Sequence, residues 1–392
     1  MQYRKDKYGN DLSVLGFGCM RFQRKAGGID MEEMEKEILL AIDRGVNYFD
    51  TAYIYPGSEA ALGKVLEKNG LRKQVVIATK LPHYLIRDLD GLEKLFREQL
   101  RRLRTDYVDY YLMHMLNDVQ TWHRLEQMGV REWIAEKKAS GAIRQVGFSY
   151  HGNTDMFCRI LDAYDWEFCQ IQYNYLDEHS QAGRRGLEYA AGKGIPVVIM
   201  EPLRGGRLVG MLPEKAKAMF DGFSVKRSYA EWGLRWLWDQ KDVTVVLSGM
   251  NTEEMILENV RIASEVLPHS VTEAEKDLYE QVVRVIREQV KVGCTACGYC
   301  QPCPMGVDIP GAFAAYNRWY GEEKKGAFLD YLKCTTFRKN GTAVSNCIGC
   351  GKCEKHCPQN IAIREELKNV RGTLETPLYR IIRCVAGRFI RF

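Results

Sequence analysis

Eight short apolar runs lie between residues 14 and 248, and amphipathic stretches separate them. In one such stretch, at 31–44, apolar residues recur three and four positions apart, as on one face of a helix. Strands that alternate with helices pair in parallel, so eight such units predict an α/β fold closed as a (β/α)8 TIM barrel. An open doubly wound sheet is the alternative, but GFGCM at 16–20 lacks the G-x-G-x-x-G turn that usually follows its first strand. The runs lie at 14–19, 46–51, 75–80, 108–114, 143–149, 168–173, 195–200 and 243–248.

The composition is that of a folded protein with room for more than one domain. The chain has 392 residues, of which 46% are hydrophobic and 27% charged, and this excludes a disordered or fibrous class. It contains neither the long apolar run of a membrane-spanning helix nor the apolar core of a secretory signal, so a cytoplasmic protein is expected. Most of the net charge of +5 lies in the tail 364–392, and the nearly neutral remainder argues against a large nucleic-acid interface.

The thirteen cysteines are concentrated near the C-terminal end, where eight of them form two groups between residues 294 and 357. Thiols clustered in this way indicate metal or redox chemistry, because disulfides are rare in a reducing cytosol. The second group, CIGCGKCEKHCP, has the C-x2-C-x2-C-x3-C-P spacing of bacterial ferredoxins, in which the fourth cysteine binds a different [4Fe–4S] cluster from the first three. The first group, CTACGYCQPCP, has one residue fewer before its last cysteine.

This spacing predicts two [4Fe–4S] clusters, each bound by three cysteines of one group and one cysteine of the other. The first cluster would be bound by Cys294, Cys297, Cys300 and Cys357, and the second by Cys347, Cys350, Cys353 and Cys303. Two structural zinc sites are the alternative, since four-cysteine zinc sites also use C-x2-C pairs. The remaining cysteines are expected to be small buried apolar residues: Cys19, Cys158, Cys169, Cys334 and Cys384.

Three parts are expected along the chain. They are a barrel over 1–285, a mostly helical ferredoxin-like iron–sulfur domain over 286–363, and a basic tail over 364–392. Helical patterns at 272–291 and around 309–333 would lie at the start of the second part and between its cysteine groups. The amphipathic tail is expected to pack back on the protein, with docking to a membrane surface or a partner as the alternative.

Four polar residues are expected at one end of the barrel, because each lies at or just after the carboxyl end of a predicted strand, where such barrels carry their chemistry. They are Asp50, Tyr55, Lys80 and His114. A tyrosine with the ordinary pKa of about 10 is a poor acid at neutral pH. An ammonium held beside it by a carboxylate would lower that pKa, and a histidine would orient a substrate carbonyl. The four residues predict a site that protonates an alkoxide as hydride reaches carbon.

The sequence around these residues resembles the aldo-keto reductases, whose catalytic tetrad is Asp, Tyr, Lys and His. FDTAYIY at 49–55, ATKLP at 78–82 and VDYYLMH at 108–114 carry the resemblance, which extends over about residues 1–285. Together with the two cysteine groups, the whole chain resembles the branch of that superfamily fused to a C-terminal ferredoxin-type domain. The resemblance implies an oxidoreductase that reduces a carbonyl or related unsaturated small molecule, with the tyrosine as general acid.

The resemblance also implies positions for a nicotinamide cofactor. Ser149 and Gln170 match the residues that hold the carboxamide, and Met200 stands where a tyrosine usually stacks on the ring. Gly249 and Met255 stand where basic residues usually bind the 2′-phosphate of NADP, which makes NAD, or no dinucleotide, credible. The full set of candidate cofactor contacts is Gly18, Met20, Ser149, Gln170, Met200, Pro202, Leu203, Arg204, Gly205, Ser248, Gly249, Met250, Asn251, Glu258 and Asn259.

The loops after the seventh and eighth runs, at 203–207 and 248–251, are typical of phosphate cradles and would suit a pyrophosphate or the phosphate of FMN. FMN is a candidate because iron–sulfur clusters carry single electrons whereas nicotinamide carries a hydride. A flavin can convert between one-electron and two-electron transfer. The expected cofactors are therefore two [4Fe–4S] clusters with NAD(P)H or FMN, and a ferredoxin-like carrier is a possible redox partner. Two other functions stay open: an electron-transfer component with the barrel as scaffold, and an enzyme whose clusters sense oxidation.

Overall fold

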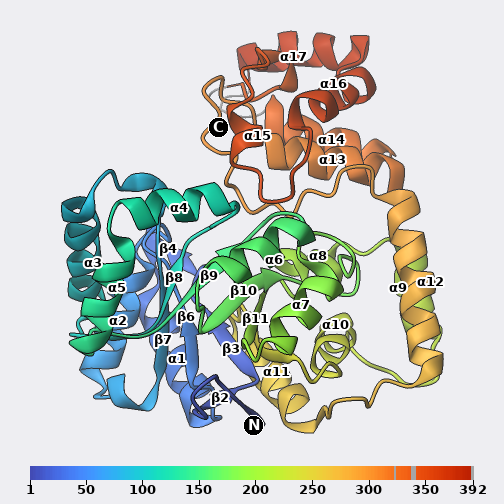
Figure 1. Ribbon diagram of the computed structural model, residues 1–392. Helices are drawn as coiled ribbons and strands as arrows, with labels where there is room; N and C mark the ends of the chain where they lie inside the picture. The colour runs from blue at the N-terminus through green and yellow to red at the C-terminus, as the bar shows by residue number, and fades with distance from the viewer. Residues whose placement is uncertain (322–323, 337–340, 390–392) are drawn as a thin grey trace. The chain divides into compact units, whose positions relative to one another are not determined.

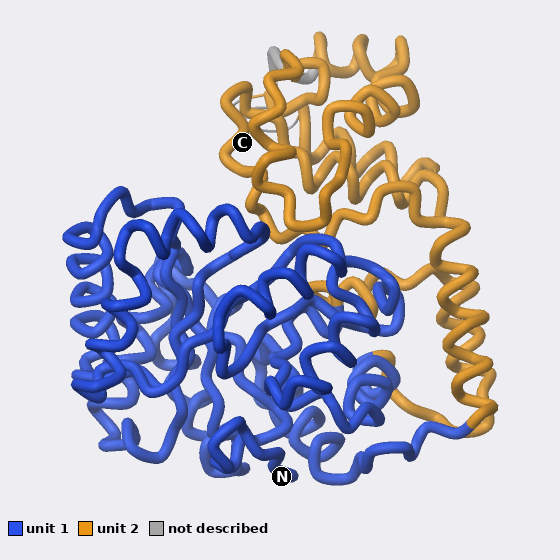
Figure 2. Tube along the Cα trace, in the orientation of Figure 1, with its two compact units in different colours: residues 1–203, 230–272 blue, residues 204–229, 273–392 orange. Residues whose placement is uncertain are grey.

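The computed structural model describes residues 1–321, 324–336 and 341–389, the last four of these by their backbone only. The chain forms two compact units (Figure 2). The barrel unit comprises residues 1–203 and 230–272, and the cysteine unit comprises 204–229 and 273–392. The sequence places the end of the barrel at 285, whereas residues 273–285 and the loop at 204–229 group with the cysteine unit.

Eight parallel strands form the closed barrel of the barrel unit (Figure 1). Their order around the barrel follows their order along the chain. Each strand overlaps one of the eight predicted runs, so the predicted (β/α)8 fold is confirmed and the open-sheet alternative is wrong. The strands are β3 (Leu15–Gly18), β6 (Tyr48–Asp50), β7 (Val76–Leu81), β8 (Val108–Met113), β9 (Ile143–Tyr150), β10 (Phe168–Gln172), β11 (Val197–Met200) and β12 (Val243–Ser248).

The amino-terminal end of the barrel is filled by packed side chains. The rings of Tyr48 and Tyr110 lie 5.3 Å apart, and that of Phe168 lies 4.8 Å from Tyr110. Leu12, from the short hairpin of β1 (Tyr3–Lys5) and β2 (Asp11–Ser13), packs in the same cluster. With this end closed by apolar packing, the carboxyl ends of the strands are left for polar side chains.

Helices connect the strands, and several of them begin at a side-chain cap. Asp30, Asp88, Asp118, Asn153 and Thr252 each accept a hydrogen bond from the backbone N–H three residues further on, which satisfies a donor in the first turn. The helices are α1 (Met31–Asp43), α2 (Ser58–Lys68), α3 (Leu89–Leu103), α4 (Val119–Gln127), α5 (Val130–Ala139), α6 (Thr154–Ala163), α7 (Gly183–Gly192), α10 (Tyr229–Trp238) and α11 (Glu253–Glu265), and a small hairpin is formed by β4 (Arg24–Lys25) and β5 (Gly28–Ile29).

The cysteine unit is helical around its own apolar core. Phe313, Tyr331, Leu367 and Val370 belong to this core, and six of the eight grouped cysteines pack against it. The loop 204–229 joins the unit through α12, where the rings of Phe220 and Tyr279 lie 6.3 Å apart. The helices are α8 (Arg207–Gly210), α9 (Glu214–Gly222), α12 (Glu273–Gln289), α13 (Ile309–Gly321), α14 (Lys324–Thr335), α15 (Lys352–Lys355), α16 (Ile363–Leu374) and α17 (Pro377–Phe389).

The C-terminal tail contacts the cysteine unit through α17. Tyr379 is fully buried, and its hydroxyl donates to Oγ1 of Thr335 at 3.0 Å. On the other side of the helix, Leu378 and Ile381 are exposed. The prediction that the tail packs back on the protein can be compared with the structure only as far as residue 389, because residues 390–392 lie outside the described residues. Within the described residues, no helix combines the length and apolar character needed to cross a membrane.

Candidate functional site

The four predicted polar residues come from three neighbouring strands of the barrel. Asp50 is the last residue of β6, Lys80 lies one residue before the end of β7, and His114 directly follows β8. These strands pair in parallel, β6 with β7 and β7 with β8, so their carboxyl ends lie side by side. Tyr55 lies in the loop between β6 and α2. The fold therefore brings the four residues to one end of the barrel.

A buried ion pair forms the base of this site. Nζ of Lys80 lies 2.6 Å from Oδ1 of Asp50 and donates a second hydrogen bond to the carbonyl of Thr51 at 2.8 Å. The other carboxylate oxygen accepts from Nε2 of Gln170 at 3.1 Å. Burial raises the pKa of Asp50, while Lys80 and Gln170 act against that rise. The lysine is 1% exposed, so its charge is held in place by these partners.

Tyr55 and His114 lie beside this pair. The ammonium of Lys80 is 5.2 Å from the centroid of the Tyr55 ring, and the ring of His114 stands nearly perpendicular to that of Tyr55 at 6.4 Å. Burial, with the charge of Lys80 adding to it, holds the pKa of His114 well below its usual range, so the imidazole is neutral. Its Nδ1 is buried and has no hydrogen-bond partner among the described residues. A cation, a phenol and a neutral imidazole thus share one site.

Two further buried histidines follow β7 and β9, the strands on either side of β8, and the sequence interpretation missed them. His83 follows β7 and His151 follows β9, and burial lowers the pKa of each to about 4. Nδ1 of His151 lies 3.2 Å from Oε1 of Gln181. A signal was present, because each histidine comes within three residues of the end of a predicted run. Single histidines after strands are common, and nothing in the sequence distinguished these two.

The residues predicted to hold a nicotinamide carboxamide lie on adjacent strands. Gln170 in β10 pairs in register with Ser149 in β9. Oγ of Ser149 accepts from the backbone N–H of Met115 at 2.9 Å, while Oε1 of Gln170 is buried and has no partner within the described chain. Tyr150 donates its hydroxyl to the carbonyl of Asn153 at 2.5 Å, which turns its side chain away from this pair. One buried acceptor is therefore left for a donor group.

The loop after β12 contains the predicted positions for the far end of a dinucleotide. Oγ of Ser248 accepts from Nδ2 of Asn259 at 3.0 Å, and Met255 is exposed. A Cβ at Gly249 would lie 3.3 Å from Cδ of Arg21, an exposed side chain that follows β3. The sequence interpretation did not include Arg21, because this residue lies far from Gly249 in the chain.

The loop after β11 divides between the two units. Pro202 and Leu203 belong to the barrel unit, and Arg204 is the first residue assigned to the cysteine unit. Arg204, Gly205 and the following glycine all adopt positive φ, at 47°, 66° and 88°. Nη2 of Arg204 donates to the carbonyl of Gly293 at 2.8 Å. The arginine predicted as a cofactor contact thus contacts the residue that precedes the first grouped cysteine.

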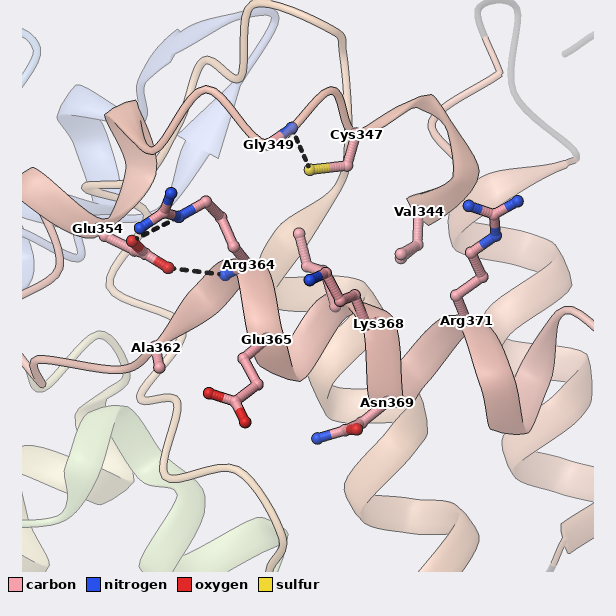
Figure 3. A pocket seen from close by; sticks show the side chains of 11 residues that line it. Val344, Cys347, Gly349, Glu354, Ala362, Arg364, Glu365, Lys368, Asn369 and Arg371 are labelled. Atoms are coloured by element: carbon pink, nitrogen blue, oxygen red, sulfur yellow. Dashed lines mark hydrogen bonds and ion pairs between the residues drawn. The ribbon is translucent and has the colours of Figure 1, made fainter.

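Two cavities in the cysteine unit are lined by the grouped cysteines, four in each. One is lined by Cys294, Cys297, Cys300 and Cys357. The other is lined by Cys303, Cys347, Cys350 and Cys353. Each set combines three cysteines of one group with one of the other, as the spacing predicts. Beside the second set, Nε of Arg364 pairs with Oε2 of Glu354 at 2.8 Å (Figure 3). Four thiols around a small, mainly apolar cavity fit an iron–sulfur cluster.

The remaining cysteines differ in exposure. Cys19, Cys169 and Cys334 are buried as expected, whereas Cys158 is half-buried and Cys384 is exposed. The expectation was wrong for Cys384, because it lies on the side of α17 that faces away from the core of the cysteine unit.

In the described part of the chain, no three His, Cys, Asp or Glu side chains converge closely enough to hold a single metal ion.

Residues 14–280 match the Aldo/keto reductase family, and residues 293–362 match the 4Fe-4S dicluster domain. The chain belongs to the aldo/keto reductase family and carries a C-terminal 4Fe-4S domain. It is an oxidoreductase of the aldo-keto reductase type, which confirms the resemblance seen in the sequence.

The relatives are distant. An aldo-keto reductase of Mycobacterium sp. (strain MCS) is 26% identical over 232 residues, covering 58% of this chain and 75% of the relative. The uncharacterized oxidoreductase YrpG of Bacillus subtilis (strain 168) is 25% identical over 314 residues, covering 69% and 93%. Among solved structures, aldo-keto reductase AKR11C1 from Bacillus halodurans (holo form) has a TM-score of 0.59 at 23% identity, covering 72% and 96%. An aldo/keto reductase from Klebsiella pneumoniae in complex with NADP and acetate has a TM-score of 0.58 at 22% identity, covering 72% and 95%. These two structures share the barrel fold.

Proposed function

We propose that this oxidoreductase reduces a carbonyl or related unsaturated small molecule, with Tyr55 as general acid. The observation that carries the proposal is the buried ammonium of Lys80, which is paired with Asp50 and lies 5.2 Å from the ring centroid of Tyr55. A fixed positive charge stabilises the phenolate that remains once the phenol has given its proton to the substrate oxygen. Asp50 holds the side chain of Lys80 in position beside Tyr55. Neutral His114 donates a hydrogen bond to the substrate oxygen and orients it.

We propose a nicotinamide as the hydride donor, at the face formed by Ser149 and Gln170. The buried, unpartnered Oε1 of Gln170 suits the amide N–H of a carboxamide. When bound, nicotinamide supplies the hydride that Tyr55 complements with a proton. We propose that Arg21, whose methylene groups lie beside Gly249, contacts a phosphate group of the dinucleotide. FMN is the alternative cofactor.

We propose that the two cysteine cavities each hold a [4Fe–4S] cluster. When bound, such clusters supply electrons one at a time, and we propose a one-electron carrier of the ferredoxin type as their donor. Cys350 is exposed, which gives such a donor access to the second set of cysteines. The first experiment is anaerobic purification with an iron count and identification of the cofactor released by acid. We expect about eight irons per chain for two four-iron clusters, together with NADP or NAD. Stoichiometric FMN would replace the nicotinamide proposal, and zinc in place of iron would overturn the cluster proposal.

The acid is tested with Tyr55→Phe. We expect kcat for carbonyl reduction to fall by about 10²–10⁴-fold, the usual contribution of a positioned acid. Tyr53→Phe is the matched control, because its ring lies 4.2 Å from the Arg102 guanidinium and phenylalanine keeps that contact. Turnover of Tyr55→Phe within a few-fold of wild type would reject the assignment. Rapid cluster reduction without turnover of any aldehyde, ketone or enone would instead favour an electron-transfer component.

A further inference from the structure

A strained residue directly follows His114, the histidine proposed to orient the substrate oxygen. Met115 has a φ of 57°, in the left-handed region that is unfavourable for a residue with a Cβ. Strain of this kind persists only where the surrounding structure holds it in place, and it is found at functional sites more than elsewhere. The hydrogen bonds on either side of Met115 therefore indicate what fixes the chain just after His114.

The backbone N–H groups of this loop are bonded to the strands on either side of β8. The N–H of His114 donates to the carbonyl of Leu81, the last residue of β7, at 2.9 Å. The N–H of Met115 donates to Oγ of Ser149 in β9 at 2.9 Å, and that of Leu116 donates to the carbonyl of the same serine at 2.9 Å. Three successive donors are thus satisfied, and the carbonyl of Met115 has a different partner.

The partner of that carbonyl is His83. This imidazole is 7% exposed, and its Nε2 lies 3.4 Å from the carbonyl oxygen of Met115. Burial lowers the pKa of His83 to about 4, so the ring is neutral and carries one N–H. Because a carbonyl oxygen only accepts, that N–H is on Nε2. Nδ1 is then an acceptor, and it is buried without a partner among the described residues.

This arrangement favours a role for the donor over a role in packing alone. A buried polar atom without a hydrogen bond destabilises the folded state, whereas an apolar aromatic ring would fill similar space without that cost. The ring of His83 lies 5.6 Å from that of Tyr84, a contact that a phenylalanine would also make. A phenylalanine lacks the N–H directed at Met115. His83 also lies three residues after Lys80, so its bond connects the segment that carries the proposed cation to the residue next to His114.

We propose that His83 is a positioning residue for His114. Its hydrogen bond keeps Met115 in the left-handed conformation and so fixes the direction in which the chain leaves His114. This inference rests on the proposed carbonyl reduction, in which His114 orients the substrate oxygen. His83 acts through Met115 and has no contact with the reacting atoms in this assignment. The bond thereby keeps the imidazole of His114 and the ammonium of Lys80 in register beside Tyr55.

The first test compares crystal structures of the full wild-type chain and of His83→Phe. The phenylalanine keeps a ring beside Tyr84 but cannot donate, so we expect Met115 to leave the left-handed region and the His114 ring to move with it. Turnover is then measured with para-nitrobenzaldehyde and NADPH. We expect kcat of His83→Phe to fall by about 10–10²-fold with KM changed less, because a misplacement of about 1 Å at a reacting group can cost that much. His83→Gln, whose amide N–H can reach the same carbonyl, should retain most of kcat.

Relief of the strain at Met115 gives an independent readout. Glycine adopts positive φ without a steric cost, so in the double variant His83→Phe with Met115→Gly the loop no longer needs the donor, and most of kcat should return. The matched control adds His269→Gly instead, because His269 has a φ of 61° in an exposed loop after α11, and kcat of this double variant should stay low. Recovery with Met115→Gly would not occur if His83 only filled space.

The structural and kinetic results separate this inference from the proposed function. If Met115 keeps its positive φ and His114 its place in His83→Phe, the inference is overturned whatever the turnover. Loss of kcat that His83→Gln does not prevent and Met115→Gly does not restore would also overturn it. A wild type that leaves the aldehyde unreduced counts against the proposed function, and the crystallographic comparison still decides the role of His83. If His83→Phe does not fold, His83→Asn, whose amide is too short to reach Met115, takes its place.

Discussion

At the scale of single residues, the proposed chemistry depends on Lys80, a buried residue that needs a counter-charge inside the barrel. Lys80 and Asp50 are 1% and 4% exposed, and their ion pair is 2.6 Å long. Removing one member of such a pair leaves an uncompensated buried charge, whereas removing both does not. The structural role of the pair and its role beside Tyr55 can therefore be separated by mutation.

We expect Asp50→Asn to lower the free energy of unfolding by roughly 3–5 kcal/mol, because Lys80 then remains buried without its counter-charge. The double variant Asp50→Asn with Lys80→Met should recover most of that stability but no carbonyl reduction, since the ammonium beside Tyr55 is gone. Urea denaturation and steady-state turnover measure the two effects. Recovery of turnover in the double variant would show that the charge beside Tyr55 is dispensable.

At the scale of elements, the sequence predicted those features of the fold that depend on the local pattern of apolar and polar residues. The eight strands overlap the predicted runs because a parallel strand covered on both faces has to be apolar along its length. The four polar residues were predictable because the fold fixes which strand ends are neighbours. Arg21 and the Arg204–Gly293 contact were not, because each joins residues far apart in the chain and leaves no spacing to detect. The same holds for the loop 204–229, whose membership of the cysteine unit depends on packing against α12.

The close approach of α2 and α3 gives a test at this scale. A Cβ at Gly63 would lie 2.5 Å from the backbone carbonyl oxygen of Arg102, which has no freedom to rotate away. We expect Gly63→Ala to lower the free energy of unfolding by about 1–3 kcal/mol, the usual cost of overpacking. The control is Gly192→Ala in α7, where a Cβ would meet no atom within 4 Å and alanine is the better helix former. Equal stability of the two variants in urea denaturation would mean that α2 and α3 do not pack as described.

At the scale of the whole molecule, each of the two units is stabilised by different interactions within itself. The barrel unit is closed by strand pairing and apolar packing, and none of its described strands contains a grouped cysteine. In the cysteine unit, each cavity is lined by cysteines of both groups, so bound clusters would tie residues 294–303 to 347–357. Because metal binding and folding are coupled in such sites, losing the clusters should loosen this unit and spare the barrel.

Hydrogen exchange before and after iron removal by an anaerobic chelator tests this division. We expect protection to fall over 294–362 and in the turn at 204–206, which is bonded to Gly293, while the barrel strands from β3 to β12 keep theirs. The strands serve as the internal control in the same sample. Simultaneous loss of protection in the strands would mean that both units unfold as one. Protection that persists over 294–362 without iron would mean that the apolar core around Phe313 and Leu367 holds the unit together by itself.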